Sequence, residues 1–400
     1  MTIDILTFGC RLNGFESEVL RETAAKAGLD DAVIINTCAV TAEAERQARQ
    51  AIRKLRRERP GVRIIVTGCA AQVNAKSFAD MPEVDRVLGN AAKLDVGSLL
   101  SSERLVISDL KELAELAPHL IEGFEGRSRA FVQIQQGCDH GCTFCIVPQA
   151  RGPSRSIAVE RIVAQAEKLV EAGYLEIVLT GVDIASWGRL DQLIISLLKA
   201  VPGIERLRLT SMDPAEITPE LIALFKAEPR LMGHLHLSMQ SGADAVLKRM
   251  ARRHRRVDLL RLRDSLPDIA LGADLIAGFP AESEADHQET LELVERLGMA
   301  HLHVFPFSSR PGTPAARLKR LTGDVVKLRA ADLRQAGERQ SEKLRTSFVG
   351  KCVRVLVEET GRGLSEAYLP VVFEGGVPGT IATVQIDGVQ KDRLQGHIIS

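Results

Sequence analysis

The first part of the chain alternates short apolar runs with segments of helical periodicity. The apolar runs cover residues 4–10, 32–38 and 63–69 and predict three strands, the first of them buried. Helical patterns follow at 15–28 and at 41–60, where Pro60 ends the second. Apolar runs of this length joined by helices are typical of a parallel sheet. The pattern predicts an N-terminal open parallel α/β sheet domain over residues 1–120. Residues 91–128 are less regular, include the acidic stretch KELAELAPHLIEGFEG, and are interpreted as a linker.

A second alternation follows between residues 125 and 345. Strands are predicted at 130–136, 175–181, 206–212, 234–240, 269–278 and 301–308, with helices at 157–172, 218–227, 243–265 and 284–297. Six strand–helix units argue for a parallel (β/α) barrel, either complete or partial. A long basic helix is predicted at about 324–347.

The pattern of hydrophobic and polar residues changes again near the C-terminus. The segments KCVRVLVEE, AYLPVVFE and GTIATVQID are short strand patterns separated by Gly-rich turns. They predict a small all-β domain, a barrel or a sandwich, over residues 346–400. The whole chain is therefore expected to be an α/β protein of three domains.

Composition narrows the class of protein. The 400 residues are 45% hydrophobic and 26% charged, and the 52 Lys and Arg balance the 52 Asp and Glu. Any nucleic-acid site must then be a local patch. The apolar runs are shorter than the roughly 18 residues that span a bilayer, and the start MTIDILTFGC does not resemble a signal peptide. We expect a cytoplasmic protein with no membrane partner, in a compartment where stable disulfides are rare.

Three of the seven cysteines end the three N-terminal apolar runs: Cys10, Cys38 and Cys69. Because the carboxyl ends of parallel strands meet at one edge of a sheet, we expect these thiols to lie together. The alternative is that they are three small buried hydrophobic residues. Cys352, on a predicted C-terminal strand, is interpreted as a buried small residue.

A second triplet lies in the segment QGCDHGCTFCIVP, directly after the first predicted barrel strand. Cys138, Cys142 and Cys145 are spaced C-x3-C-x2-C, and the strand's carboxyl end is the face where barrel enzymes keep their chemistry. A structural zinc site takes four ligands, and no fourth cysteine is nearby. Iron–sulfur clusters take cysteine thiolates, and three of them leave one iron open to a substrate or cofactor. Zinc with a distant fourth ligand stays an alternative.

This C-x3-C-x2-C segment resembles the radical S-adenosylmethionine (SAM) superfamily. The resemblance implies that Cys138, Cys142 and Cys145 bind a [4Fe-4S] cluster whose open iron holds SAM, which is split by one electron to a 5′-deoxyadenosyl radical. It further implies SAM contacts at Phe144, Gly181, Asp183 and Ile276, for which an ordinary turn or packing is the alternative. Ser238 and Gln240 end the fourth predicted strand and could face the ribose of SAM or the substrate, with hydrogen bonds at the barrel rim as the alternative. Arg310 follows the sixth strand and is a candidate for contact with the SAM carboxylate or a substrate phosphate.

Nearly the whole chain resembles the methylthiotransferases. In that family, three upstream cysteines hold a second [4Fe-4S] cluster, which maps to Cys10, Cys38 and Cys69, and the C-terminal domain is a TRAM domain, a small RNA-binding barrel. The stretches FGCRLNGFESE, HLHLSMQSGADAVLKRM and HVFPFSSRPGTPAA look like the branch that methylthiolates the adenine of threonylcarbamoyladenosine in tRNA. The implied partners are tRNA, SAM, an external electron donor and a sulfur donor. Alternative targets are isopentenyladenosine in tRNA or a ribosomal protein, and a non-enzymatic metal- or RNA-binding protein is the alternative of another class.

Two basic runs are candidates for RNA contact, at residues 46–59 and 248–256. The second contains no acidic residue, so it cannot neutralise itself, and phosphate contact is as reasonable as a solvated helix face. From residue 350 onward, five basic residues stand against six acidic ones. RNA binding is therefore expected at the basic runs more than at the C-terminal domain.

Overall fold

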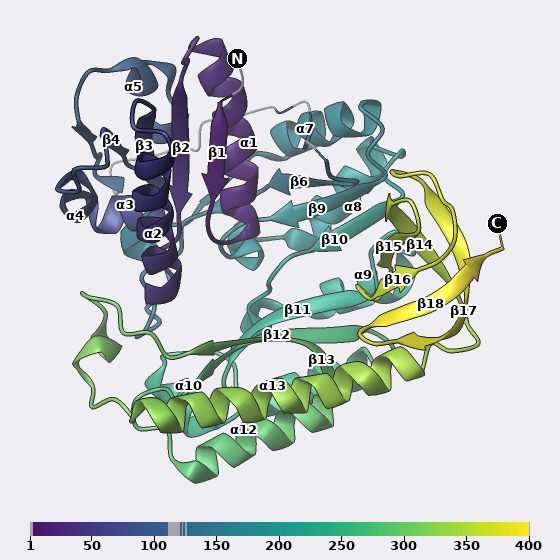
Figure 1. Cartoon of the computed structure of the whole chain (residues 1–400). Coiled ribbons are helices and arrows are strands. Elements are labelled where there is room, and N and C mark those ends of the chain that lie inside the picture. Colours follow the sequence, from purple (N-terminus) through teal and green to yellow (C-terminus); the bar gives the residue numbers. More distant parts are fainter. Residues whose placement is uncertain (1–2, 111–120, 122, 125, 400) are drawn as a thin grey trace.

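The computed structural model describes residues 3–110, 121, 123–124 and 126–399 (Figure 1). Its N-terminal part is a five-stranded parallel sheet in the order β1-β2-β3-β4-β5, which confirms the predicted architecture. The strands are β1 (Asp4–Thr7), β2 (Ala32–Thr37), β3 (Arg63–Gly68), β4 (Arg86–Leu88) and β5 (Leu105–Val106), and the helices are α1 (Arg11–Lys26), α2 (Ala42–Glu58), α3 (Cys69–Val73), α4 (Ala75–Ala79) and α5 (Val96–Leu100).

Two expectations for this domain are wrong. The first strand, β1, is the edge strand of the sheet and is largely exposed, whereas its apolar run had predicted a buried strand. Residues 92–106 are not a linker, because they form the short helix η1 (Ala92–Leu94), α5 and β5, which pairs in parallel with β4. Residues 111–120, 122 and 125 of the expected linker lie outside the described residues.

All six strands predicted for the central barrel are present. They form two parallel three-stranded sheets, β10-β9-β6 and β11-β12-β13, which are joined by single bridges between Leu207 and Leu231 and between Met212 and Leu237. Among the described residues no ladder joins β6 to β13, so the barrel is partial. The strands are β6 (Arg129–Gln133), β9 (Glu176–Thr180), β10 (Arg206–Leu209), β11 (His234–Gln240), β12 (Ala270–Ala277) and β13 (Met299–Pro306).

The helices of the barrel follow the predicted positions with two exceptions, because the helix at Leu190–Ala200 was not predicted and one predicted helix is divided in two. Helices α7 (Val159–Glu171), α8 (Leu190–Ala200), α9 (Pro219–Ala227) and α12 (Glu284–Leu297) alternate with the strands, and α13 (Gly323–Thr346) runs along the outside of the second sheet (Figure 1). The helix predicted at 243–265 is instead two helices, α10 (Asp244–Arg249) and α11 (Arg256–Ser265). Ala251 between them has a left-handed φ of 57°, which interrupts the helix and places Arg252 in a loop.

The C-terminal domain is a closed five-stranded barrel. It consists of β14 (Cys352–Glu359), β15 (Arg362–Ser365), β16 (Pro370–Val372), β17 (Ile381–Gln390) and β18 (Arg393–Ile398), of which β15 and β18 were not predicted. The domain is held to β10 by the buried guanidinium of Arg206, which pairs with Glu176 at 2.7 Å and donates to the carbonyls of Leu364 and Ser365. Cys352 lies on the predicted strand but is exposed, because it is the first residue of β14 and faces outward.

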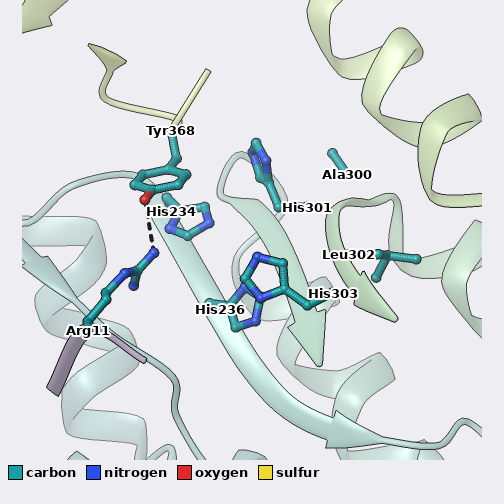
Figure 2. A pocket seen from close by; sticks show the side chains of 8 residues that line it. All are labelled: Arg11, His234, His236, Ala300, His301, Leu302, His303 and Tyr368. Carbon is teal, nitrogen blue, oxygen red and sulfur yellow. Dashed lines mark hydrogen bonds between the residues drawn. The ribbon is translucent and has the colours of Figure 1, made fainter. Parts of the chain in front are cut away.

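The three parts of the chain meet around Tyr368, in the turn between β15 and β16. Its hydroxyl accepts a hydrogen bond of 2.9 Å from Arg11 of α1, and its ring stacks on His234 of β11 with centroids 4.8 Å apart (Figure 2). These residues line a cavity of about 230 Å³. None of the helices in the described part of the chain has the length and apolar content needed to cross a membrane.

Candidate active site

The first cysteine triplet lies at the carboxyl ends of the strands of the N-terminal sheet. Cys10 precedes α1, Cys38 directly follows β2, and Cys69 directly follows β3. The glycine before Cys10 has a φ of +118°, and a Cβ atom on it would lie 2.8 Å from the Cβ of Cys38. Only glycine fits this close approach, so the FGC sequence allows the ends of β1 and β2 to come together. The structure therefore brings the three thiols to one edge, as their positions after the strands predicted.

The thiols of this triplet interact electrostatically. Burial raises the pKa of Cys38 to about 12, and the neighbouring thiols of Cys69 and Cys10 add to the rise. Thiols this close resist losing their protons together, so they need a positive group to become thiolates. A bound metal cluster is the kind of group that supplies this charge. Cys10 is exposed, so the alternative that the three cysteines are only small buried hydrophobic residues fits less well.

A buried group of three charges lies beside these thiols. Glu16 of α1 contacts Arg151 at 2.7 Å and Lys93 at 2.6 Å, and none of the three side chains is more than 3% exposed. Burial alone would raise the pKa of Glu16, but Arg151 and Lys93 outweigh it and lower the pKa to about 2. Two cations share one carboxylate, so positive charge remains in excess. This excess favours an anionic thiolate cluster at the sheet edge.

Arg151 belongs to the central domain and connects the two cysteine triplets. It ends helix α6 (Val147–Arg151), which begins two residues after Cys145. Ile146 and Ala150 pack in the same apolar cluster as Cys69, and the carbonyl of Ala150 accepts a hydrogen bond of 2.6 Å from Asn90. One short segment therefore carries a cysteine of the second triplet and contacts the surroundings of the first.

The second triplet lies in the loop after β7 (Gln135–Gln136), at the carboxyl end of the first barrel strand. Burial raises the pKa of Cys138 to about 12, with Asp183 and the thiols of Cys145 and Cys142 adding to the rise. Burial likewise raises the pKa of Cys145 to about 11, and Cys142 adds to it. These three thiols are therefore also close enough to interact.

The donor set of each triplet is three thiols that do not form a tight group for one metal ion. A single zinc ion with bonds of about 2.3 Å would hold sulfur atoms about 3.8 Å apart. Among the described residues, the sulfur atoms of neither triplet all lie within 4.8 Å of one another. Iron–sulfur clusters take cysteine thiolates, and a structural zinc site takes four ligands, so three thiols without a fourth cysteine fit an iron–sulfur cluster by the chemistry of the donor set.

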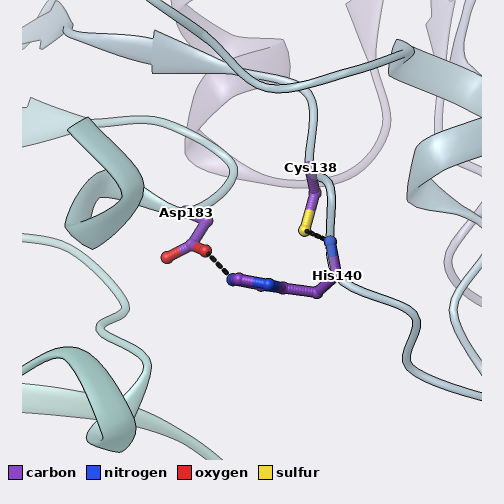
Figure 3. A group of neighbouring side chains, drawn as sticks. All are labelled: Cys138, His140 and Asp183. Carbon is purple, nitrogen blue, oxygen red and sulfur yellow. Dashed lines mark hydrogen bonds and ion pairs between the residues drawn. The ribbon is translucent and has the colours of Figure 1, made fainter. Parts of the chain in front are cut away.

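His140 is directed toward Asp183 (Figure 3). Its Nε2 lies 2.6 Å from the Asp183 carboxylate and 2.9 Å from Arg253. The Cys138 sulfur, a His140 ring nitrogen and an Asp183 carboxylate oxygen all lie within 4.8 Å of one another. This group includes neither Cys142 nor Cys145. With its ring nitrogen engaged by Asp183, His140 is not positioned as a fourth ligand to the triplet. The Asp183 contact with SAM stays a prediction.

Arg252 is a site residue that pattern reasoning missed. Its Nη1 lies 3.4 Å from the sulfur of Cys142, and its Nη2 donates to the carbonyl of Ser238 at 2.7 Å. The sequence had placed it in a basic run available to phosphate. The only sign of its role in the sequence was an arginine without a nearby acidic residue, in a segment that was predicted to be one helix.

The two basic runs are largely neutralised by contacts inside the protein. In the second run, Arg253 pairs with Asp213 and Glu216, and Arg256 pairs with Glu292. These acidic partners are far away in the sequence. They neutralise arginines of the run although the run itself contains no acidic residue. In the first run, the paired residues are Arg46 with Glu43, Arg49 with Glu45, Arg56 with Asp85, and Arg59 with Asp4.

The other predicted SAM contacts occupy different surroundings. Phe144 and Ile276 pack against one apolar cluster that includes Met250 and Phe279, so the structure brings these two together. Gly181 leads into a turn whose next two amides donate to the side chain of Gln135.

Two more of these residues lie on β11, and the last lies apart from them. Ser238 contacts Arg252 through its carbonyl, and Gln240 ends the strand with a left-handed φ of 68°. Arg310 is buried and pairs with Glu45 of α2 at 2.9 Å, which ties the central domain to the N-terminal one. Its contact with SAM or phosphate stays a prediction.

Comparisons with known proteins agree with this site. A model of the radical SAM superfamily matches residues 132–294, and a model described as uncharacterized protein family UPF0004 matches residues 2–89. The chain is 43% identical to the threonylcarbamoyladenosine tRNA methylthiotransferase MtaB of Rickettsia prowazekii, over 98% of this chain and 96% of that protein. The chain belongs to the radical SAM methylthiotransferase family.

Further matches place this methylthiotransferase among its relatives. It is 37% identical to a tRNA-2-methylthio-N(6)-dimethylallyladenosine synthase of Cereibacter sphaeroides, over 98% of this chain and 97% of that protein. Among solved structures, the radical SAM methyltransferase TsrM of Kitasatospora setae shares the fold, with a TM-score of 0.58 at 13% identity over 79% of this chain and 74% of that one. As a radical SAM methylthiotransferase, the protein is an enzyme that uses a [4Fe-4S] cluster and SAM.

Proposed function

We propose that the enzyme adds a methylthio group to the adenine of threonylcarbamoyladenosine in tRNA. The observation that carries this proposal is the pair of cysteine triplets, one on each of two domains, connected by the segment from Cys145 to Arg151. Cys138, Cys142 and Cys145 hold the cluster that binds SAM, and Cys10, Cys38 and Cys69 hold a second [4Fe-4S] cluster. The relative with 43% identity carries this activity in its name.

When bound, a reduced cluster with SAM supplies a radical able to remove hydrogen from an unreactive carbon. The residues of this chain hold and shield these groups. Three thiolates leave the cluster one free position, and Arg252 places a positive charge beside Cys142. Phe144 and Ile276 contribute an apolar wall from one cluster of side chains, which keeps water away from reactive species.

The proposed reaction requires partners besides this chain. The reaction needs tRNA, an external electron donor and a sulfur donor, and it takes place in the cytoplasm. The second candidate substrate is isopentenyladenosine in tRNA, which is favoured by the 37% identity to a dimethylallyladenosine synthase. The higher identity to the threonylcarbamoyladenosine enzyme favours the first candidate.

Nucleoside analysis of total tRNA tests the choice. Mass spectrometry of tRNA from a strain lacking the gene should show loss of the methylthio form of threonylcarbamoyladenosine, and the wild-type gene should restore it. A complemented strain carrying the Cys142→Ala variant should not. Loss of the methylthio form of isopentenyladenosine instead would select the second candidate, and unchanged tRNA would reject both.

Arg252→Met is expected to lower the reduction potential of the SAM-binding cluster. Reduction adds negative charge to the cluster, and the guanidinium 3.4 Å from the Cys142 sulfur favours that charge. A loss of about 1.4 kcal/mol in this interaction corresponds to about 59 mV for one electron. A redox titration followed by electron paramagnetic resonance would measure it, using the signal that changes when SAM is added. Arg252→Lys keeps the charge and should shift the potential less, whereas an unaltered potential in Arg252→Met would contradict the role.

A further inference from the structure

The cavity where the three domains meet has no role in the function described so far (Figure 2). Strands β11 and β13 supply the imidazoles of His234, His236, His301 and His303, α1 supplies Arg11, and the C-terminal domain supplies Tyr368. Residues at the cavity are close in sequence to Cys10 and to the predicted SAM contact Ile276. Arg11 directly follows Cys10, and Asp274, which contacts His236 and His303, is two residues before Ile276 on β12.

Positive charge dominates the surroundings of this cavity. The guanidiniums of Arg11, Arg129 and Arg208 lie 5.5, 5.6 and 5.0 Å from the centre of the Tyr368 ring. Burial would raise the pKa of Tyr368, but these three arginines outweigh it and lower the pKa.

Arg11 is the one of these three arginines without an acidic partner. Arg208 is paired with Glu176, and Arg129 is paired with Glu358. Within the described part of the chain, no carboxylate lies within 4.0 Å of Arg11, which contacts the Tyr368 hydroxyl. Arg11 is therefore available to an anion that enters the cavity.

His234 gives a second and independent indication of a ligand. It is 2% exposed, and neither of its ring nitrogens has a hydrogen-bond partner among the described residues. Burial lowers its pKa well below the usual range, so it is neutral and has one N–H to donate. Buried polar groups in folded proteins are almost always hydrogen-bonded. An oxygen atom of a molecule bound in the cavity can supply the missing partner.

A metal cation is the competing occupant. Asp274 accepts from His236 at 3.0 Å and from His303 at 3.1 Å, and their ligand atoms lie within 4.8 Å of one another. However, both imidazoles already contact the same carboxylate oxygen, and the guanidinium of Arg11, which has no carboxylate partner among the described residues, lines the same cavity. Like charges disfavour a cation in such a place, whereas the unpaired guanidinium favours an anion.

We propose that this cavity binds the carboxylate of the threonylcarbamoyl group of the substrate nucleoside, with Arg11 as its cationic partner. The inference rests on the proposed function and identifies the group of the substrate that the enzyme recognises. Guanidinium and carboxylate form two parallel charge-assisted hydrogen bonds, and the neutral N–H of His234 and the Tyr368 hydroxyl are further donors. An isopentenyl group has no charge to offer Arg11, so this residue determines specificity for an acidic modification.

The test compares two RNAs and four proteins. The RNAs are stem-loops of one sequence that carry either threonylcarbamoyladenosine or unmodified adenosine, and the proteins are the full-length wild type, Arg11→Gln, Arg11→Lys and Arg57→Gln, all with both clusters. Affinities are measured anaerobically by fluorescence anisotropy. Iron content and visible absorption confirm that the clusters are intact in each protein.

The wild type is expected to prefer the modified RNA by roughly ten- to a hundredfold, the range for a charged hydrogen-bonded pair. Arg11→Gln should lose this preference, and Arg11→Lys should keep part of it. Arg57 is exposed on α2, so Arg57→Gln should leave the ratio of the two affinities unaltered even if total RNA affinity falls.

Other results would overturn the inference or the function separately. An unaltered ratio in Arg11→Gln overturns the inference, as does a wild type that methylthiolates the modified RNA without preferring it. Zinc that co-purifies with the holoprotein and is lost in Asp274→Asn also overturns it, because the cavity would then hold a cation. A wild type that prefers the modified RNA and cleaves SAM but leaves the RNA unmodified contradicts the proposed function alone.

Discussion

Glu16→Gln is expected to destabilise the protein by about 3–5 kcal/mol. Arg151→Met is expected to destabilise it less, although each change removes one member of the same buried group. Glu16 is the only carboxylate among the three side chains, and it contacts Arg151 and Lys93 at 2.7 and 2.6 Å. Without it, neither Arg151 nor Lys93 has a carboxylate partner among the described residues, and burial and the charge of Arg151 both lower the pKa of Lys93. Without Arg151, Glu16 and Lys93 still form a neutral pair.

Chemical unfolding of the cluster-containing proteins under anaerobic conditions measures this order. Glu18→Gln is the matched control, because Glu18 lies on the same helix and pairs with the partly exposed Arg21 at 3.3 Å. Such pairs contribute about 0–1 kcal/mol. If Arg151→Met proved the more damaging change, the excess positive charge would not be the property that matters.

The same group has a defined pH dependence. The pKa of Glu16 is lowered from about 4.5 to about 2 in the folded protein. A carboxyl group of this kind stabilises the folded state fully above its unfolded pKa, and the effect is lost as the pH falls toward the folded value. The stability difference between the wild type and Glu16→Gln should therefore be complete above about pH 4.5 and shrink between pH 4.5 and 2.

The cysteine sites were predictable because their geometry follows from local pattern. Parallel strands end at one edge of a sheet, so Cys10, Cys38 and Cys69 had to come close once the strands were recognised. The helix predicted at 284–297 has these bounds in the structure, since its apolar periodicity and its start at Ser283 are both local. Features of this type depend on residues within one or two turns of each other.

The missed features depend on contacts between distant residues. Arg151 meets Glu16 across 135 positions, and Arg252 meets Cys142 across 110. No pattern within a window identifies such partners. The break at Ala251, which frees Arg252 from a helix, is a single left-handed residue of a type that usually favours helices. Arg11 is similar, because only the docking of the C-terminal domain brings Tyr368 next to it.

Buried contacts hold the two proposed cluster sites together. Cys145 and Arg151 lie on the same short segment, and Arg310 pairs with Glu45 across the same pair of domains. The distance between the triplets is therefore fixed by buried contacts and not by a flexible linker. A sulfur-inserting enzyme benefits from this, because reacting groups misplaced by about 1 Å lose much of their rate.

Cys142→Ala is expected to abolish SAM cleavage and to remove one cluster. In the proposed site, Cys142 is one of the three thiolates that hold the SAM-binding cluster, and we expect the remaining two not to retain it. Iron content should fall from about eight to about four atoms per chain, as expected for two four-iron clusters. Formation of 5′-deoxyadenosine from SAM under reducing conditions should fall to background.

Cys352→Ala is the matched control for this change. Cys352 is exposed on β14, and its sulfur lies 3.0 Å from the Gln385 side chain, in a domain that contains neither triplet. This variant should keep its iron and form 5′-deoxyadenosine as the wild type does. SAM cleavage retained in Cys142→Ala would show that the open iron is held elsewhere. Iron retained in full without cleavage would instead show that another side chain replaces the thiolate and fills the free position, which would contradict the assigned site.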